Sequence, residues 1–490
     1  MAAFGLKNII GKISGREFLL KRLEPFDRSD ATVLLWLLAI WAAFVFPAIA
    51  LRSFFFEEGY VVGVARAAIE DSNWLVPHLY GWRFVERPNL MAWIVAVAGM
   101  AFGGINQWIA RAPTVLSLLG GCLMVFYLVR RHTGALAALF GALCVLVSPI
   151  ILQKVYVAEP DVLVSVILFG TFMIWWNGVE AAGIGVLRWL GICFLLVLAV
   201  LVKGPQPIAY FGIGAAAYHL CLRQWRDLCA LALVGLAASS VAASWYWAVY
   251  IPGDLSSWLW HSRIGFKPSI AQYLASRISF TAVLTLELLP AMLLAIPLAW
   301  SVLRKRIGKN DELVFALLLY AFCTSIILAL WPGGRPRYAM PAIFAVAAIA
   351  GLAFERFRVA RPNLVNAAVL VGAALGAYQI VLSWLVMPAF SELFQRTRIA
   401  AGVITTVMGN SSATLYANSE TRDTGVFAYM RKPLRIVPFD DLQRLQAPVW
   451  ILVGAEYERR FREAHPDADI GTHVILSTDE KHHLLELRKR

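Results

Sequence analysis

Long apolar segments separated by short polar segments run from about residue 31 to residue 388 of this chain. A helix needs about 17 to 25 mostly apolar residues to cross a bilayer. Segments of that length predict eleven spans, at 31–52, 110–129, 134–152, 162–178, 186–202, 206–222, 228–250, 281–302, 312–331, 338–354 and 364–387. The apolar segment 89–104 is shorter and ends in glycines. We expect it to form a helix that lies at the membrane interface or re-enters the membrane.

The pattern changes near residue 389. Between there and the C-terminus, helix-like stretches such as DDLQRLQ and EYERRFREAH alternate with short apolar runs, at 412–417, 434–438, 449–454 and 473–476. This alternation is typical of a small α/β domain. The sequence therefore predicts a cytoplasmic N-terminal segment (1–30), a transmembrane domain (31–388) whose first outer loop (53–109) carries interfacial helices, and a C-terminal α/β domain (389–490).

The distribution of lysine and arginine predicts how the chain is oriented. With the N-terminus inside, 18 of the 30 basic residues before residue 389 fall on the inner side and 12 on the outer side. An excess of basic residues in cytoplasmic loops is the usual pattern in membrane proteins. Eleven spans then place the C-terminal domain outside. We expect a multi-pass protein of the cell inner membrane with a cytoplasmic N-terminus and a periplasmic C-terminal domain.

Composition and charge narrow the class further. With 60% hydrophobic and 15% charged residues and a mean hydropathy of +0.67, the chain is too apolar for a soluble globular enzyme or a disordered protein. The net charge of +13 would suggest nucleic acid as a partner in a soluble protein. Here most of the excess lies in the inner loops, so orientation explains it and no nucleic acid is expected.

The outer loops carry acidic and basic residues directly beside the apolar segments. Ionisable groups at a membrane edge are costly and are functional candidates for that reason. Two acidic pairs, Glu57 with Glu58 and Glu159 with Asp161, share these loops with several arginines and lysines. A carboxylate can take the proton of an attacking hydroxyl, while Arg and Lys stabilise a leaving phosphate. From residue types alone this is one of several interpretations, and a cation-binding transporter is another.

Motif order adds a resemblance. The segment EEGYVVGVARAAIEDSNWLVPHLYGWRFVERPNLMAW is similar to the first outer loop of C-type (GT-C) membrane glycosyltransferases of the aminoarabinose-transferase and protein O-mannosyltransferase kind. Further along, AEPDVLVSV, VKGPQPI, SWYW and RPRYAMPA resemble later motifs of that family in the same order. The resemblance covers about residues 30 to 390. At two positions the chain departs from the family pattern, with Glu57 in place of Asp and Arg87 in place of Lys.

The resemblance implies a GT-C fold of about 11 to 13 spans and transfer of a sugar, with inversion, from a polyprenyl-phosphate-linked donor to lipid A, lipopolysaccharide or a related glycolipid on the periplasmic face. It assigns catalysis to Glu57, Asp161 and Glu58, donor-phosphate binding to Arg87, Lys203, Arg335 and Arg337, and the acceptor or sugar pocket to Arg66, Glu86, Tyr338 and Glu159. It implies no definite cofactor, and a divalent metal ion at Asp161 and Glu57 is an open alternative. We expect a monomer.

Other interpretations remain open at this stage. Within the class, the protein could be an O-glycosyltransferase that modifies proteins; outside it, a secondary transporter or a non-catalytic envelope assembly protein. A transporter is less favoured because no apolar segments pair into inverted halves. Glu57 could serve only the dipole of the helix that follows it, Glu58 and Asp161 could mark helix starts, and Arg87 and Lys203 could extend to lipid headgroups.

Overall fold

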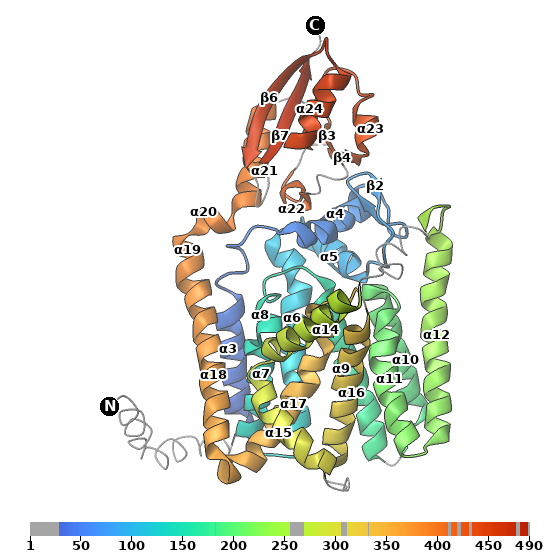
Figure 1. Cartoon of the computed structure of the whole chain (residues 1–490), viewed down its shortest axis with the longest axis vertical. Helices are drawn as coiled ribbons and strands as arrows, with labels where there is room; N and C mark the ends of the chain where they lie inside the picture. Colours follow the sequence, from blue (N-terminus) through green and yellow to red (C-terminus); the bar gives the residue numbers. More distant parts are fainter. Residues whose placement is uncertain are drawn as a thin grey trace.

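The structure is a computed structural model that describes residues 29–181, 183–254, 269–304, 311–331, 333–409, 413–418, 423–430, 434–476 and 481–488. The predicted N-terminal segment therefore lies almost wholly outside the described residues. A bundle of long helices forms the larger part of the molecule, and a small sheet domain stands over one of its ends (Figure 1). Two shorter helices, α4 (Phe56–Glu70) and α5 (Leu90–Ala101), lie between the two parts.

Helices occupy all eleven apolar segments predicted from the sequence. They are α3 (Asp30–Val45), α6 (Gln107–Arg130), α7 (Ala135–Val147), α8 (Pro149–Leu152), α9 (Pro160–Glu180), α10 (Val186–Lys203), α11 (Gln206–Cys221), α12 (Trp225–Val249), α14 (Ile270–Glu287), α15 (Ala291–Arg304), α16 (Glu312–Leu330), α17 (Pro341–Ala360), α18 (Pro362–Val381), a π-helical turn (Leu382–Val386) and α19 (Met387–Ala389). Among the described helices, 6 are long and apolar enough to cross a membrane, or 7 if α14 and α15 count as one span. The polytopic helical class is confirmed, whereas the number eleven stays a prediction.

Two of the predicted continuous spans are wrong. The segment 281–302 is divided between α14 and α15, which meet at an angle of 107°. The segment 134–152 breaks at Ser148, where α7 ends and the short α8 begins. Each break contains or directly precedes a proline. Pro290 lies between α14 and α15, and Pro149 is the first residue of α8. Proline lacks the N–H that continues a helix and disfavours helical geometry in the residue before it, so each apolar run is interrupted.

The bundle is held together by close contacts between small residues. Helix α17 is buried from Pro341 to Phe354. A methyl group at Gly141 of α7 would lie 3.1 Å from the carbonyl oxygen of Ala347, and one at Gly351 would lie 2.9 Å from that of Ala137. Such contacts let helix backbones approach closely inside a membrane protein. The packing fixes the upper end of α17, which follows directly on the 3₁₀ turn Pro336–Ala339.

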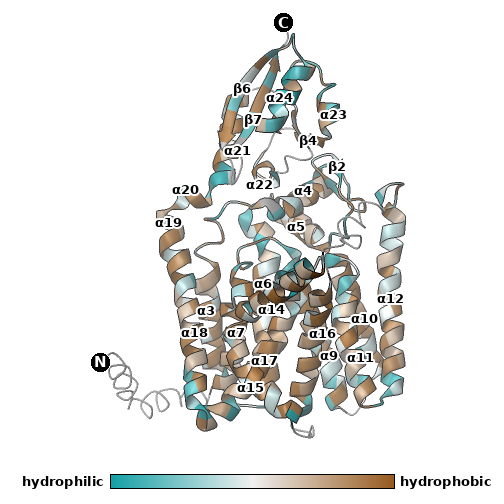
Figure 2. Cartoon of the chain, viewed as in Figure 1, coloured by the Kyte–Doolittle hydropathy of each residue, from teal (hydrophilic) through white to brown (hydrophobic). Residues whose placement is uncertain are grey.

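The predicted interfacial helix is present as α5, whose 12 residues are too few to cross a bilayer. It packs against α4 through Val62, Ala65 and Val95, and Ala428 of the C-terminal domain belongs to the same buried cluster. The two-stranded hairpin of β1 (His78–Leu79) and β2 (Trp82–Arg83) connects α4 to α5. Figure 2 shows hydrophobic residues along the bundle helices and hydrophilic residues at the ends of these helices and around α4 and the β1–β2 hairpin.

The C-terminal domain is a mixed five-stranded sheet with short helices. After α20 (Ser391–Phe394) and α21 (Arg396–Met408), the chain forms β3 (Leu415–Asn418), α22 (Thr424–Phe427), β4 (Leu434–Val437), α23 (Phe439–Leu442), β5 (Val449–Gly454), α24 (Ala455–Ala464), β6 (Asp469–Leu476) and β7 (Lys481–Arg488). The strand order is β4-β3-β5-β7-β6, with β3 parallel to both β4 and β5 and the other pairs antiparallel. The α/β prediction is confirmed, but it missed β7. This strand lies between two others and its Leu484 and Leu485 are both buried, so it lacks the alternation that marks a half-exposed strand.

Candidate active site

Four short segments meet at the end of the bundle that faces α4. They are the start of α4, the loop before α9, the end of α10 and the 3₁₀ turn Pro336–Ala339. Three of them are set by a local signal: Pro160 opens α9, Pro336 opens the 3₁₀ turn, and Gly204 ends α10 with a φ of +86°. A positive φ of this kind is accessible to glycine at little cost. These helix ends hold the predicted site residues together.

Ion pairs connect the four segments. Glu57 Oε1 lies 2.9 Å from Arg337 Nη2, Glu159 pairs with Lys154, and Asp161 pairs with Lys203. Lys154 also attracts the carboxylate of Glu57. We call this group the ion-pair cluster: Glu57, Lys154, Glu159, Asp161, Lys203 and Arg337. It balances three acidic against three basic side chains.

Accessibility differs within the ion-pair cluster. The side chains of Glu57 and Arg337 are 34% and 26% exposed, whereas the Glu159 and Asp161 side chains are only 5% and 7% exposed. Removing charges from water costs several kcal/mol per ion even when they are paired, so a buried ion pair is weak evidence for stability. A cluster of this kind at a membrane edge is better explained by function. The Glu57–Arg337 pair is the part that a substrate can reach.

The cluster shifts the ionisation of its members in opposite directions. Burial opposes the charge on Glu57, but attraction by Arg337 and Lys154 outweighs it and lowers the pKa of the Glu57 carboxyl. Burial and the neighbouring Asp161 instead raise the pKa of Glu159 to about 8, despite the attraction of Lys154. Glu57 is therefore ionised at neutral pH. It can orient a hydroxyl by accepting its hydrogen bond, although its lowered pKa makes it a weaker base.

Tyr338 and Arg87 extend the cluster on its basic side. The ring of Tyr338 lies 4.9 Å from Lys203 Nζ and 5.4 Å from Arg337 Cζ, measured to the ring centroid, which suits a cation–π contact with each. The Cβ of Arg87 lies 3.9 Å from the position that a methyl group on Gly204 would take. Arg87 therefore stands beside the end of α10 that carries Lys203.

Glu86 and Arg335 lie at the margins of this arrangement. The hydroxyl of Tyr246 donates to the carbonyl oxygen of Glu86 at 3.2 Å, which ties the loop before α5 to α12. Arg335 is exposed and directly precedes the 3₁₀ turn that carries Arg337.

Glu58 and Arg66 are engaged elsewhere. Glu58 is fully buried, and Arg111 binds both of its carboxylate oxygens at 2.8 Å. The backbone N–H groups of Phe55 and Ala158 donate to the same carboxylate at 2.9 and 2.8 Å. Arg66 Nη1 donates to the carbonyl oxygen of Met430 in the C-terminal domain at 3.0 Å. We infer that both residues position other groups and do not touch a substrate.

Sequence reasoning missed the importance of two cations, Arg111 and Lys154. Arg111 is fully buried and also donates to three backbone carbonyls, those of Ile49, Arg52 and Ser53. An arginine inside the apolar segment 110–129 was the available signal, because a charge placed there needs a partner. For Lys154 no local signal identifies Glu159 as its partner, since only the fold of the loop decides the pairing.

The cluster does not fit the predicted metal site as it stands. Among the described residues, no group of three or more His, Cys, Asp or Glu side chains is arranged to hold a metal ion. The two proposed ligands, Glu57 and Asp161, are each paired with a cation, Arg337 and Lys203. A metal ion would have to displace these cations, and a divalent metal at Glu57 and Asp161 stays a prediction.

Comparison with known proteins agrees with this geometry. Residues 86–247 match the family described as dolichyl-phosphate-mannose-protein mannosyltransferase. The structure superimposes on apo ArnT from Cupriavidus metallidurans with a TM-score of 0.69 and 18% sequence identity, over 93% of this chain and 97% of that one. This chain has the fold of a C-type membrane glycosyltransferase. The undecaprenyl phosphate-bound form of the same ArnT gives a TM-score of 0.68 at 16% identity.

Sequence relatives point the same way. The chain is 25% identical over 346 residues to an undecaprenyl phosphate-alpha-4-amino-4-deoxy-L-arabinose arabinosyl transferase of Edwardsiella ictaluri. The alignment covers 67% of this chain and 61% of the relative, so the chain spans about three fifths of the length of the curated relatives it matches. The resemblance to C-type glycosyltransferases that the motifs indicate is confirmed.

Proposed function

We propose that this protein transfers a sugar from a polyprenyl-phosphate-linked donor to a glycolipid of the cell envelope, such as lipid A or lipopolysaccharide, with inversion of the anomeric centre. The observation that carries the proposal is the ion-pair cluster, where an accessible carboxylate stands next to several cations at the membrane edge. The relatives support the choice of donor, because their names specify an undecaprenyl-phosphate-linked sugar and an arabinosyl transferase. Lipid A is the first acceptor to test.

The basic side of the cluster suits the donor phosphate. Arg87 lies beside Gly204, the residue after Lys203. Arg335 directly precedes the 3₁₀ turn that carries Arg337. Arginine can bind two phosphate oxygens at once through its planar fork, whereas lysine acts as a point charge. Fixed cations that meet the charge developing on a departing phosphate lower the barrier of the transfer.

The acidic side suits the acceptor. The acceptor oxygen attacks the anomeric carbon, the bond from that carbon to the phosphate oxygen breaks, and polyprenyl phosphate leaves with the bonding electrons. If the acceptor is a hydroxyl, its proton passes to the carboxylate of Glu57. If the acceptor is a phosphate oxygen, no proton has to be removed and Glu57 only orients the substrate. Attack opposite the leaving phosphate gives inversion.

The location of the protein forms part of the same proposal. The excess of basic residues on the inner side of the bundle supports a cytoplasmic N-terminus and a C-terminal domain in the periplasm. The family match over residues 86–247 also supports a second candidate acceptor, the hydroxyl of a protein serine or threonine.

Two substitutions test the assignment. Glu57→Gln and Arg87→Ala should each lower sugar transfer by about 100-fold or more, because they remove the acceptor carboxylate and a phosphate ligand. Transfer is measured by mass spectrometry of lipid A in proteoliposomes that contain the lipid-linked sugar. Glu70→Gln, at the exposed far end of α4, and Arg361→Ala, exposed between α17 and α18, are matched controls that should retain activity.

Full activity in both site variants would refute the site. Mass spectrometry of lipid A and of glycosylated proteins from a deletion strain separates the two acceptors. Loss of a sugar from protein alone would replace the glycolipid by the protein acceptor.

A further inference from the structure

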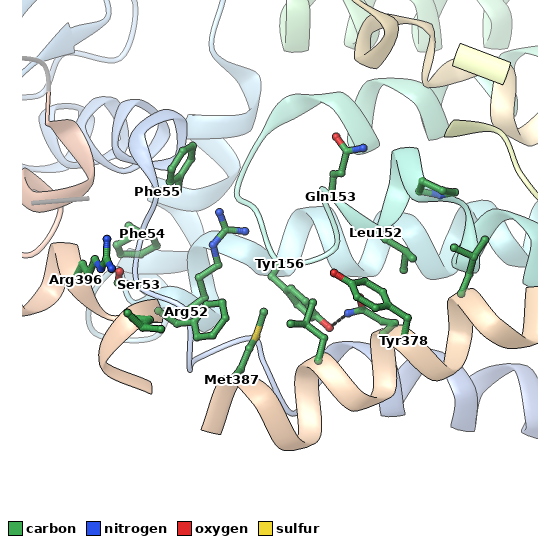
Figure 3. A pocket seen from close by; sticks show the side chains of 16 residues that line it. Arg52, Ser53, Phe54, Phe55, Leu152, Gln153, Tyr156, Tyr378, Met387 and Arg396 are labelled. Atoms are coloured by element: carbon green, nitrogen blue, oxygen red, sulfur yellow. Dashed lines mark hydrogen bonds between the residues drawn. The ribbon is translucent and has the colours of Figure 1, made fainter. Parts of the chain in front are cut away.

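The loop between α8 and α9, residues 153–159, carries Lys154 and Glu159 of the ion-pair cluster and borders a cavity of about 610 Å³ (Figure 3). Gln153 and Tyr156 of this loop line the cavity, together with side chains from α8, α18 and the segment before α4. The cavity offers the loop no packed side chains on that side. Hydrogen bonds therefore have to hold the loop in place there.

The hydroxyl of Tyr156 joins several such hydrogen bonds. It donates to the carbonyl oxygen of Phe44 at 2.6 Å and accepts from the side-chain amide of Gln379, the contact drawn as a dashed line in Figure 3. The hydroxyl of Ser383 donates to the carbonyl oxygen of Gln379 at 2.8 Å. All three side chains are buried. We call Tyr156, Gln379, Ser383 and the carbonyl group of Phe44 the tyrosine network.

The network caps the end of α3, the helix that leads toward α4. Pro47 lies two residues beyond the last residue of α3. Because proline has no N–H, the carbonyl oxygen of Ala43, four residues earlier, lacks its usual backbone partner. Trp384 donates to this oxygen at 2.9 Å, and Tyr156 donates to the next carbonyl along the chain. Of these two caps, only Tyr156 belongs to the loop that carries Lys154.

A π-helical turn keeps the polar side chains above α18 on one face. In this part of the chain the buried residues are Gln379, Ser383 and Met387, each four positions from the next. Around a regular α-helix, a spacing of four drifts by about 40° at each step. The wider π-helical turn Leu382–Val386 takes up this drift, and such turns are frequent at functional sites. The irregular turn therefore keeps Gln379 and Ser383 directed into the bundle.

The network does more than fill space between helices. A set of buried polar groups whose hydrogen bonds are all satisfied specifies one geometry, whereas apolar contacts tolerate small shifts. Apolar side chains of the same shape can replace hydrogen-bonded partners at little cost in stability. The network is therefore better explained by the position that it gives the loop. Lys154, two residues before Tyr156, pairs with Glu159 and attracts the carboxylate of Glu57.

We propose that Tyr156 is a positioning residue for the transfer, whose hydroxyl, bound to Gln379 and to the carbonyl oxygen of Phe44, keeps Lys154 beside Glu57. The inference rests on the proposed function, which assigns Glu57 to the acceptor. Movement of the loop would change both the charge and the position of this carboxylate. A misplacement of about 1 Å at a reacting group can lower a rate by about 100-fold.

Carbodiimide labelling tests the position of Lys154 without any transfer reaction. A carbodiimide modifies protonated carboxyl groups, so mass spectrometry of the protein labelled at different pH values reports how Glu57 titrates. Burial opposes the charge on Glu57, but Arg337 of the 3₁₀ turn and Lys154 of the loop hold its pKa below the ordinary value, and Glu159 is the neighbouring acid. Tyr156→Phe frees the loop to move Lys154 away. The labelling midpoint of Glu57 should then rise by about 0.5 pH units or more.

Three controls accompany this variant. Trp384→Phe removes the other side-chain hydrogen bond to the end of α3, a bond that does not involve the loop, and it should leave the midpoint of Glu57 unchanged. Gln379→Met removes the donor to Tyr156 from the opposite side and should raise the midpoint by a smaller amount. The exposed Glu70 serves as an internal reference whose midpoint should not move in any variant.

Transfer kinetics separate positioning from folding. In Tyr156→Phe, kcat should fall by about 10-fold or more, while the KM for the lipid-linked sugar stays unchanged. The acid limb of the rate against pH should move upward together with the labelling midpoint of Glu57. A variant that only reduces the folded fraction would instead lose the same factor in rate at every pH.

An unchanged Glu57 midpoint in Tyr156→Phe would overturn the proposal, and so would an equal rise in Trp384→Phe, because loosening of the bundle would then be the cause. The labelling does not depend on turnover. A wild-type protein that transfers no sugar would refute the proposed function, while a raised midpoint in Tyr156→Phe would still support the positioning of Lys154 by Tyr156.

Discussion

At the residue scale, neighbouring positions on α4 have different tasks. Glu57 and Glu58 are adjacent in sequence, and successive residues of a helix project about 100° apart. Glu57 is turned to the cluster and meets Arg337, while Glu58 is turned inward and meets Arg111. The Glu58 carboxylate also accepts the N–H of Ala158, directly before Glu159. It thereby ties the first acidic motif to the second.

The buried pair predicts a large effect on stability. Glu58→Gln should lower the free energy of unfolding by about 3–5 kcal/mol, because it leaves Arg111 buried without a counter-charge. Thermal unfolding of the purified protein in detergent measures the change. The control Glu463→Gln breaks an ion pair whose side chains are 82% and 69% exposed, and it should change stability by less than about 1 kcal/mol. Equal unfolding temperatures for both variants would contradict the positioning role of Glu58.

Glu159 predicts how stability depends on pH. Its pKa is raised to about 8 in the folded protein from an ordinary value of 4.5, so the folded state binds more protons than the unfolded state between these values. Its contribution is therefore favourable at low pH and is lost as the pH rises toward 8. The apparent melting temperature should fall across this range, and Glu159→Gln, which does not titrate, should flatten the curve. An unchanged slope in Glu159→Gln would contradict the assignment.

At the scale of elements, α4 is held by an unusually close contact with α22. A methyl group at Gly59 would lie 2.1 Å from the carbonyl oxygen of Thr424, and one at Gly425 would lie 2.6 Å from that of Phe54. Both obstructing atoms are backbone atoms, which cannot turn aside as a flexible side chain can. The two glycines therefore allow the C-terminal domain to rest directly on the helix that carries Glu57.

Substitution of a glycine in this contact and of a glycine outside it should have opposite effects on stability. Gly59→Ala should destabilise the protein and reduce transfer, because α4 and α22 would have to separate. Gly402→Ala lies in α21 with open space around the added methyl group, so it should stabilise the protein by about 0.5–1 kcal/mol through its higher helix propensity. Melting temperatures and transfer rates of the two variants provide the comparison. If Gly59→Ala kept full stability and activity, the close contact between α4 and α22 would not be required for either.

At the scale of the whole molecule, the C-terminal domain is fastened to the membrane part by several hydrogen bonds. The hydroxyl of Tyr429 accepts from the N–H of Phe54 and from Gln107 at 2.8 and 2.9 Å, and the N–H of Ile436 donates to the carbonyl oxygen of Tyr80 at 2.9 Å. Together with Arg66, these bonds join the domain to α4, the hairpin after it and α6. The domain therefore covers the end of the bundle where α4 and the ion-pair cluster lie (Figure 1).

The proposed orientation predicts which cysteines a membrane-impermeant maleimide can reach. Arg459→Cys, on an exposed position of α24, should be labelled in cells whose outer membrane alone is permeable. The native Cys221 and Cys229 are exposed near the other end of the bundle and should react only after the inner membrane is opened. The reverse labelling pattern would contradict a periplasmic C-terminal domain.

The sequence by itself determined the class of the fold and the order of its parts. Apolar segments of bilayer length, a short interfacial segment, an alternating C-terminal region and five motifs in order were enough, because hydropathy and motif spacing are local properties of the chain. Hydropathy did not predict the bend between α14 and α15, because Pro290 interrupts the helix without making the segment less apolar. It did not predict strand β7 either, because this strand lies between two others and lacks the alternation of a half-exposed strand.

Only the tertiary structure decided which charges meet. Glu57 pairs with Arg337, 280 positions away, and Glu58 pairs with Arg111, 53 positions away. Electrostatic attraction acts over a few ångströms in space, and sequence separation does not specify that distance. The packing of α4 against α6 and against the 3₁₀ turn before α17 therefore gives two adjacent glutamates different partners, one accessible and one buried.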